Sequence, residues 1–175
     1  MSAERFIARF AVLLAVACVT VVGATVLAVR SPALRTHLGL GRPPAYRVDA
    51  QIDVPDRLYR SSSHTLFIFA RSSCAACQAA KPTFAALADR LRRASSDVVL
   101  ITGGADARDE AAYASDLGLD ASHLVPMNLS ALRVKLVPTL VLVDQGGRVV
   151  YSIEGVPTDA DQARLIEAAA SRSPR

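Results

Sequence analysis

The chain contains few residues of the kinds that bind transition metals. Three cysteines and three histidines occur among its 175 residues, and only Cys74 and Cys77 lie close together. A structural zinc site takes four cysteine or histidine ligands. The other candidates stand alone in the sequence: Cys18, His37, His64 and His123. A zinc site is therefore not favoured, and no metal ligand is assigned.

The globular part also lacks an excess of basic residues. The formal net charge is +4, but residues 1–44 hold five arginines against one glutamate, whereas residues 45–175 hold fifteen residues of each sign. The basic patch with interleaved aromatic side chains that is typical of nucleic-acid binding is missing. The net charge belongs to the N-terminal segment, and we expect no nucleic-acid partner.

Charge is absent altogether from Phe10 to Val29, a run of 20 residues. A helix of that length spans about 30 Å, the thickness of the hydrocarbon core of a bilayer. The apolar part of a cleaved signal peptide is shorter, about 7–15 residues. We therefore expect residues 1–29 to form a cytoplasmic tip and a transmembrane anchor, residues 30–44 a linker, and residues 45–175 one folded domain. Cys18 would then lie in lipid.

The stretch from Thr65 to Leu91 carries the strongest pattern in this domain. Residues 65–70 are almost wholly apolar, as in a strand buried on both faces. Cys74 and Cys77 follow, at the expected first turn of a helix, and four apolar residues then recur on one helical face: Phe84, Leu87, Ala88 and Leu91. At about 100° per residue, Cys77 projects onto this buried stripe and Cys74 onto its exposed edge.

This asymmetry suits exchange between a dithiol and a disulfide. A thiol at a helix N-terminus meets the positive end of the helix dipole, which favours the nucleophilic thiolate. A half-buried thiol one turn later can attack the resulting mixed disulfide and release the partner. A purely structural disulfide is the alternative, but a bridge between residues this close constrains little chain. The pattern favours a redox dithiol.

Strands and helices are expected to alternate along the remainder of the domain, which indicates an α/β sandwich. Pro82 is expected to kink the helix that contains it. The other expected elements are an edge strand at 46–54, strands at 98–102 and 124–127, a helix capped by Asp106 or Asp109, a helical turn at 129–136, a hairpin of 139–144 and 148–154, and a final helix capped by Thr158.

Two motifs resemble those of the thioredoxin superfamily. Cys74-Ala75-Ala76-Cys77, with Pro82 five residues later, is similar to its active-site helix, and Val137-Pro138-Thr139 is similar to its cis-proline loop. The long spacing between the motifs and the N-terminal anchor resemble the membrane-anchored TlpA-type branch. The resemblance implies a thioredoxin-like α/β sandwich with a strand–helix insertion, preceded by one transmembrane helix.

The resemblance also implies roles for individual residues. Cys74 would attack, Cys77 would resolve, and Pro138 would be cis and face the dithiol. Three neighbouring residues would bind the substrate chain: Val137, Ser73 and Thr139.

Three positions depart from the family's pattern. Thioredoxin has a buried aspartate where this chain has Ile68, and TlpA-type proteins often have a glutamate where this chain has Ala80. Ser73 replaces the tryptophan that commonly precedes the first cysteine. Both usual proton acceptors for the buried thiol are thus missing from these positions. Lys81 projects onto the same helix edge as Cys74, and we assign it a modulating role through its positive charge.

The expected function is that of a membrane-anchored thiol–disulfide oxidoreductase that uses its own dithiol and no separate cofactor. Its clients would be protein thiols and disulfides, with a redox partner in the membrane or periplasm. A reductase of apocytochrome c in cytochrome c maturation is one such role. Arginines around residues 10–29 do not fix the orientation, because long domains cross membranes largely regardless of such charges. The resemblance implies the extracytoplasmic, periplasmic side of the cell membrane.

Two other functions depend on some of the same residues. Thiolates and imidazole suit copper, so the two cysteines with His123 could make a copper metallochaperone of the thioredoxin fold. The peroxidase pattern of peroxiredoxins requires a proline where Phe67 and Ala70 stand, so that activity is not expected.

Overall fold

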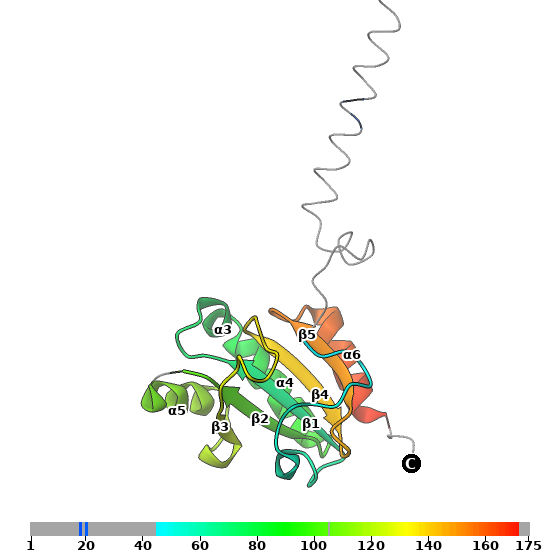
Figure 1. Ribbon diagram of the computed structural model, residues 1–175, viewed down its shortest axis with the longest axis horizontal. Helices are drawn as coiled ribbons and strands as arrows, with labels where there is room; N and C mark the ends of the chain where they lie inside the picture. The colour runs from blue at the N-terminus through cyan, green and yellow to red at the C-terminus, as the bar shows by residue number, and fades with distance from the viewer. Residues whose placement is uncertain (1–17, 19, 21–44, 105, 172–175) are drawn as a thin grey trace, which may run out of the picture. The chain divides into compact units, whose positions relative to one another are not determined.

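The computed structural model describes residues 18, 20, 45–104 and 106–171 (Figure 1). The chain separates into two compact units, Met1–Pro43 and Pro44–Arg175, and the described residues other than Cys18 and Thr20 belong to the second. The expected anchor at residues 10–29 lies outside the described residues, apart from Cys18 and Thr20. Within the described part of the chain, no helix is both long and apolar enough to cross a membrane.

The second unit is built on one mixed sheet of five strands in the order β3-β2-β1-β4-β5. Strands β1, β2 and β3 run parallel, and β4 is antiparallel to both β1 and β5. The strands are β1 His64–Ala70, β2 Asp97–Thr102, β3 Leu124–Pro126, β4 Thr139–Asp144 and β5 Val149–Glu154. The helices are η1 Asp56–Leu58, α3 Ala75–Ala79, α4 Lys81–Arg93, α5 Ala107–Asp116, η2 Ala121–His123 and α6 Asp159–Ala170. This arrangement confirms the expected α/β class. Along the sequence, α5 and β3 come between β2 and β4, within the stretch between the two motifs where the insertion was expected.

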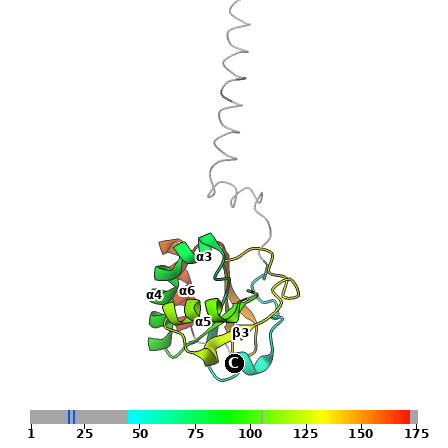
Figure 2. The same cartoon turned by 90° about the vertical axis from the view of Figure 1, so that its left-hand side faces the viewer.

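The two faces of the sheet are covered differently. All seven residues of β1 are buried, and their side chains alternate between the faces. Leu66 and Ile68 pack with the apolar residues of α4, α5 and α6, whereas Phe67 and Phe69 pack with irregular chain. The turned view shows the helices on one side of the sheet and loops on the other (Figure 2). The centre of β1 is thus held on both faces, which fixes its carboxyl end.

The edge strand expected at 46–54 is not formed. Only Gln51 makes an isolated bridge, to Arg148, because Asp49 adopts a left-handed backbone with φ 67° that interrupts an extended run. Tyr46, Ile52 and Val54 are nevertheless buried, so the segment covers the loop-side face of the sheet. The helical turn expected at 129–136 is replaced by turns and bends.

The expected kink at Pro82 takes the form of a complete break. Helix α3 ends at Ala79 with Ala80 as its C-cap, and α4 begins at Lys81 with Pro82 in its first turn. Proline has no N–H to donate and is tolerated in the first turn of a helix, where that group has no partner. The break gives the dithiol a short helix of its own.

The stability of the folded domain should depend on pH through His64, the first residue of β1. Its side chain is buried, Nδ1 has no hydrogen-bond partner among the described residues, and burial lowers the pKa of the imidazole, opposed by the charge of Asp144. The unfolded chain therefore takes up a proton at a higher pH, and stability present at neutral pH is lost on acidification through the histidine range. The melting temperature should fall between pH 7.5 and pH 5, and His64→Gln should flatten that fall. Equal slopes in the two proteins would contradict this role.

Candidate active site

Cys74 lies where the carboxyl end of β1 passes into α3. It is the N-cap residue of that helix, and its Sγ accepts the backbone N–H of Cys77 at 3.2 Å. The sulfur thus occupies the position that a side-chain oxygen takes in an ordinary N-cap. Its side chain is partly exposed, so an incoming group has access to it.

Cys77 lies one turn further along α3 and is fully buried. Burial raises the pKa of its thiol to about 12, with a further rise from its hydrogen bond to Cys74 and an opposing backbone hydrogen bond at Arg71. Both cysteines are present as free thiols. The projection of the two thiols onto exposed and buried sides is confirmed.

This difference predicts unequal reactivity of the reduced thiols. Iodoacetamide at pH 8 should label Cys74 roughly tenfold or more faster than Cys77, because alkylation requires an exposed thiolate. Mass spectrometry of the peptides after timed quenching measures both rates in one sample. Equal rates would remove the argument from burial.

The loop before β4 brings a second motif to the dithiol. The Val137–Pro138 peptide bond is cis, as the resemblance implied, and the Cys74 thiol donates to the Val137 carbonyl at 3.6 Å. Gly155 N–H donates to the Pro138 carbonyl at 2.7 Å. Thr139 is fully buried, and its hydroxyl donates to the carbonyl of Leu136 at 2.8 Å. The structure therefore brings Val137 to Cys74, while the side chain of Thr139 shapes the loop from within.

A cleft of roughly 280 Å³ opens on the other side of the dithiol. It lies between the loop that follows β1, α3 and α5, and its lining includes Ser73, an exposed residue directly before Cys74. The remaining lining residues are Ser72, Gln78, Asp109, Ala112, Tyr113 and Asp116. Solvent thus reaches the dithiol loop from the side of α5.

Lys81 faces α5. Its Nζ forms an ion pair with the Asp116 carboxylate at 2.6 Å and lies 5.9 Å from the centre of the Tyr113 ring. The Tyr113 hydroxyl in turn donates to the Cys77 carbonyl at 3.0 Å. The modulating role assigned to Lys81 stays a prediction, with its charge shared with Asp116.

A buried carboxylate that sequence analysis missed lies beside the loop between β1 and α3. Glu110 of α5 is 3% exposed, and its Oε1 accepts both the N–H and the hydroxyl of Ser72 at 2.9 Å. Its Oε2 is buried without a hydrogen-bond partner among the described residues. In the sequence, Glu110 looks like a solvated acid in the first turn of a helix. The only hint in the sequence is the pair Gly103-Gly104. The structure explains the second glycine, because a Cβ at position 104 would lie 1.8 Å from Glu110 Oε1.

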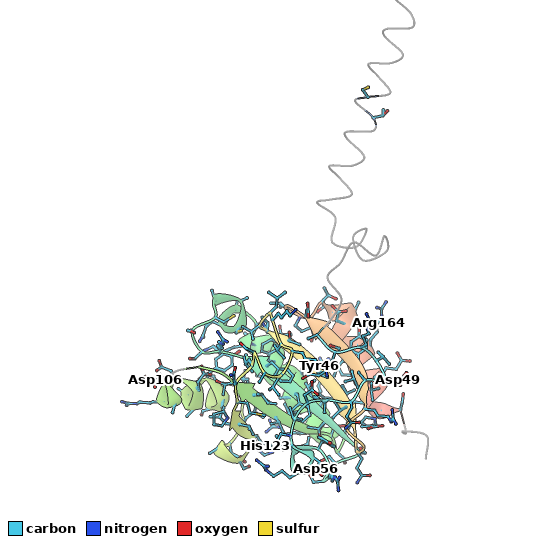
Figure 3. All side chains as sticks on the ribbon, in the orientation of Figure 1. Tyr46, Asp49, Asp56, Asp106, His123 and Arg164 are labelled. Carbon is cyan, nitrogen blue, oxygen red and sulfur yellow. The ribbon has the colours of Figure 1, made fainter. Side chains whose placement is uncertain are left out.

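The copper site expected from Cys74, Cys77 and His123 is not assembled, because His123 lies at the opposite end of the sheet. Its ring contacts Asp97 at 3.3 Å and Asp120 at 2.8 Å, and Asp97 begins β2, whereas Cys74 follows the far end of the parallel strand β1. Figure 3 shows His123 beside β3, away from α3. Within the described residues, no group of three or more histidine, cysteine or acidic side chains is placed to hold a metal.

Several solved structures have a fold similar to that of this domain. No protein-family model and no curated protein matches the sequence. Among solved structures, a putative thiol:disulfide interchange protein DsbE from Chlorobium tepidum is 21% identical, with a TM-score of 0.52 over 64% of this chain and 83% of that one.

Two further structures are similar. A putative thioredoxin from Neisseria meningitidis is 17% identical, with a TM-score of 0.54 over 73% of this chain and 91% of that one. A secreted thiol-disulfide isomerase from Corynebacterium glutamicum is 16% identical, with a TM-score of 0.52 over 62% and 72% of the two chains. The domain therefore has the thioredoxin fold that its two motifs implied.

Proposed function

We propose that this chain is a thiol–disulfide oxidoreductase that exchanges disulfides with protein clients. One observation carries the proposal: two free thiols share one helical turn, the first accessible at the N-cap and the second buried. Thiol–disulfide exchange requires these two states, a thiol that a client can reach and a second thiol that only the enzyme's own mixed disulfide can reach.

The reaction runs in two balanced steps. The Cys74 thiolate attacks a sulfur of the client disulfide, a mixed disulfide forms, and one client sulfur leaves as a thiolate that takes up a proton. The Cys77 thiol loses its proton and attacks Cys74 Sγ, the mixed disulfide breaks, and the second client thiolate leaves. The client gains two electrons and the enzyme becomes a disulfide; the reverse sequence oxidises a client. The dithiol is itself the redox centre.

The surface around the cis-proline loop is suited to an extended client chain. Leu136 and Val156 are large apolar residues that are 47% and 48% exposed. Leu136 directly precedes Val137, and Val156 follows Gly155, which is hydrogen-bonded to Pro138. An apolar client segment on these side chains would place its backbone beside Val137, and its disulfide above Cys74.

The proposal is tested with the full-length chain in detergent, with Cys18→Ala leaving two thiols. The chain should accelerate the reduction of insulin disulfides by dithiothreitol, followed as turbidity. The matched control is the Cys74→Ser/Cys77→Ser variant, which should match the reagent alone. If both proteins gave the uncatalysed rate, the chain would not be an oxidoreductase of this kind.

We further propose that residues 10–29 anchor the domain to the cell membrane on the periplasmic side, where a membrane or periplasmic partner exchanges electrons with it. The charge-free run supports an anchor, and a reductase acting on apocytochrome c in cytochrome c maturation would need such a partner. A membrane-impermeant maleimide should label Cys74 in cells with a permeable outer envelope and an intact inner membrane. Labelling only after the inner membrane is lysed would place the domain in the cytoplasm.

A further inference from the structure

We propose that Glu110 is the base of the resolving step: it takes the proton that leaves Cys77, directly or through a water molecule from the adjoining cleft. The inference rests on the proposed function, and it supplies an acid that the sequence lacks at Ile68 and Ala80. Both of those residues lie in the apolar core, so the carboxylate comes from α5 instead.

The resolving thiol needs such a base. Because burial raises the pKa of Cys77 to about 12, almost none of this thiol is ionised at pH 7. A positioned proton acceptor typically contributes 10²- to 10⁴-fold to a rate. Deprotonation of Cys77 is therefore the step in which a nearby carboxylate has the most to contribute.

Glu110 and Cys77 meet the same short segment of the chain. Oε1 of Glu110 accepts two hydrogen bonds from Ser72, and the backbone of Arg71, the preceding residue, lowers the pKa of Cys77 and so partly opposes the effect of burial. Because both of its donors bind Oε1, Ser72 leaves Oε2 without a partner among the described residues. A buried oxygen without a hydrogen-bond partner lowers the stability of the fold, so its presence calls for an explanation such as a role in catalysis.

Helix α5 directs a second side chain to the same place. Tyr113 is three residues after Glu110, which puts it on the same helical face, and its hydroxyl binds the Cys77 carbonyl. Burial raises the pKa of Tyr113, and the charges of Cys77, Cys74, Glu110 and Asp116 raise it further. The phenol is thus within electrostatic reach of both thiols and of Glu110.

The proposed step balances in protons and electrons. The Cys77 S–H bond breaks and its proton goes to Oε2 of Glu110, the sulfur forms a bond with Cys74 Sγ, and the electron pair of the broken mixed disulfide leaves on the client sulfur. Glu110 then returns the proton to solvent or to that client thiolate. The ionisable groups that line the adjoining cleft are Tyr113, Asp116 and Asp109, with Lys81 bound to Asp116.

The two chemical steps can be followed separately with one equivalent of 5,5′-dithiobis(2-nitrobenzoate). Attack by Cys74 releases one coloured thiolate, and resolution by Cys77 releases the second. In full-length Cys18→Ala protein in detergent, Glu110→Gln should slow the second phase roughly 10²-fold at pH 7. The first phase should stay within about twofold, since the glutamine oxygen still accepts from Ser72 while the amide cannot take a proton. The deficit should shrink as pH rises and Cys77 ionises unaided.

Ser72→Ala is the matched control, because it removes one donor to Oε1 and keeps the acid. Its second phase should stay close to that of the parent protein. Equal slowing of both phases in the two variants would mean that Glu110 only holds the loop, and a parental second phase in Glu110→Gln would likewise overturn the inference.

The parent protein gives a test that needs no substitution. The rate of its second phase should level off with pH below the ionisation of Cys77, and a rate that climbs steadily to pH 10 would exclude the base. Release of a single thiolate by the parent protein would instead mean that the proposed function itself fails.

Discussion

Replacement of Cys77 by serine is expected to stop the reaction at a mixed disulfide between Cys74 and the client. Cys74 keeps its place at the N-cap in this variant, because the sulfur is held by the backbone N–H of residue 77. The serine hydroxyl cannot displace a thiolate, so turnover should become undetectable while the first attack continues. The adduct should accumulate in cells and be visible on non-reducing gels.

The same variant identifies the client. Mass spectrometry of the trapped species gives the partner and the cysteine that was attacked. The Cys74→Ser variant is the matched control and should trap nothing, because the remaining thiol is fully buried. An equal yield of adducts in both variants would mean that the roles of the two cysteines are not divided as proposed, and an absence of adducts in Cys77→Ser would argue against protein clients.

The parts of the fold that were predictable are those in which local chemistry and tertiary packing agree. The run before Cys74 is apolar because β1 is buried on both faces, and the stripe from Phe84 to Leu91 is the buried face of α4. Pro82 marks the break between α3 and α4 because it lacks a backbone donor. Thr158 caps α6 as expected, and Asp161 completes a capping box with it.

The parts that were missed depend on contacts between distant segments. The segment at 46–54 has the alternation of a strand, yet it covers a sheet face, because Asp49 turns the backbone and Tyr46 packs on Phe69. His123 seemed free to approach the dithiol until the parallel pairing of β1 and β2 set it at the other end of the sheet.

Glu110 is the most instructive omission in the candidate site. Its position in the first turn of a helix is ordinary for an acid, and nothing local distinguishes it from Asp109. Its burial results from the crossing of α5 over the loop after β1, which brings together residues 38 positions apart. Such a residue can be recognised only from the folded structure, in which the carboxylate occupies the space that a side chain at position 104 would need.

That contact leads to the second large expected effect, which concerns stability. Gly104→Ala should lower the free energy of unfolding by about 1–3 kcal/mol, the usual cost of overpacking a filled interior. The new Cβ would lie 1.8 Å from Oε1, 2.5 Å from Cδ and 2.8 Å from Cγ of Glu110. The carboxylate is buried and bound to Ser72, so it must leave those hydrogen bonds to make room.

A double-mutant cycle isolates this contact from the other consequences of the substitution. In a Glu110→Ala background the clash is gone, and Gly104→Ala should then cost no more than about 0.5 kcal/mol, so the two losses should fail to add by roughly the size of the clash. Urea unfolding of the four proteins measures the coupling, provided that their unfolding free energies fall with urea concentration at the same slope.

Gly146→Ala is a suitable control, because the nearest atom to its new Cβ is an oxygen of the Asp144 side chain at 3.2 Å. Its cost in unfolding free energy should be the same with or without Glu110. Strict additivity of the Gly104 and Glu110 substitutions would mean that the carboxylate is not held against the glycine, and the structural basis for its place beside the loop that leads to the dithiol would be lost.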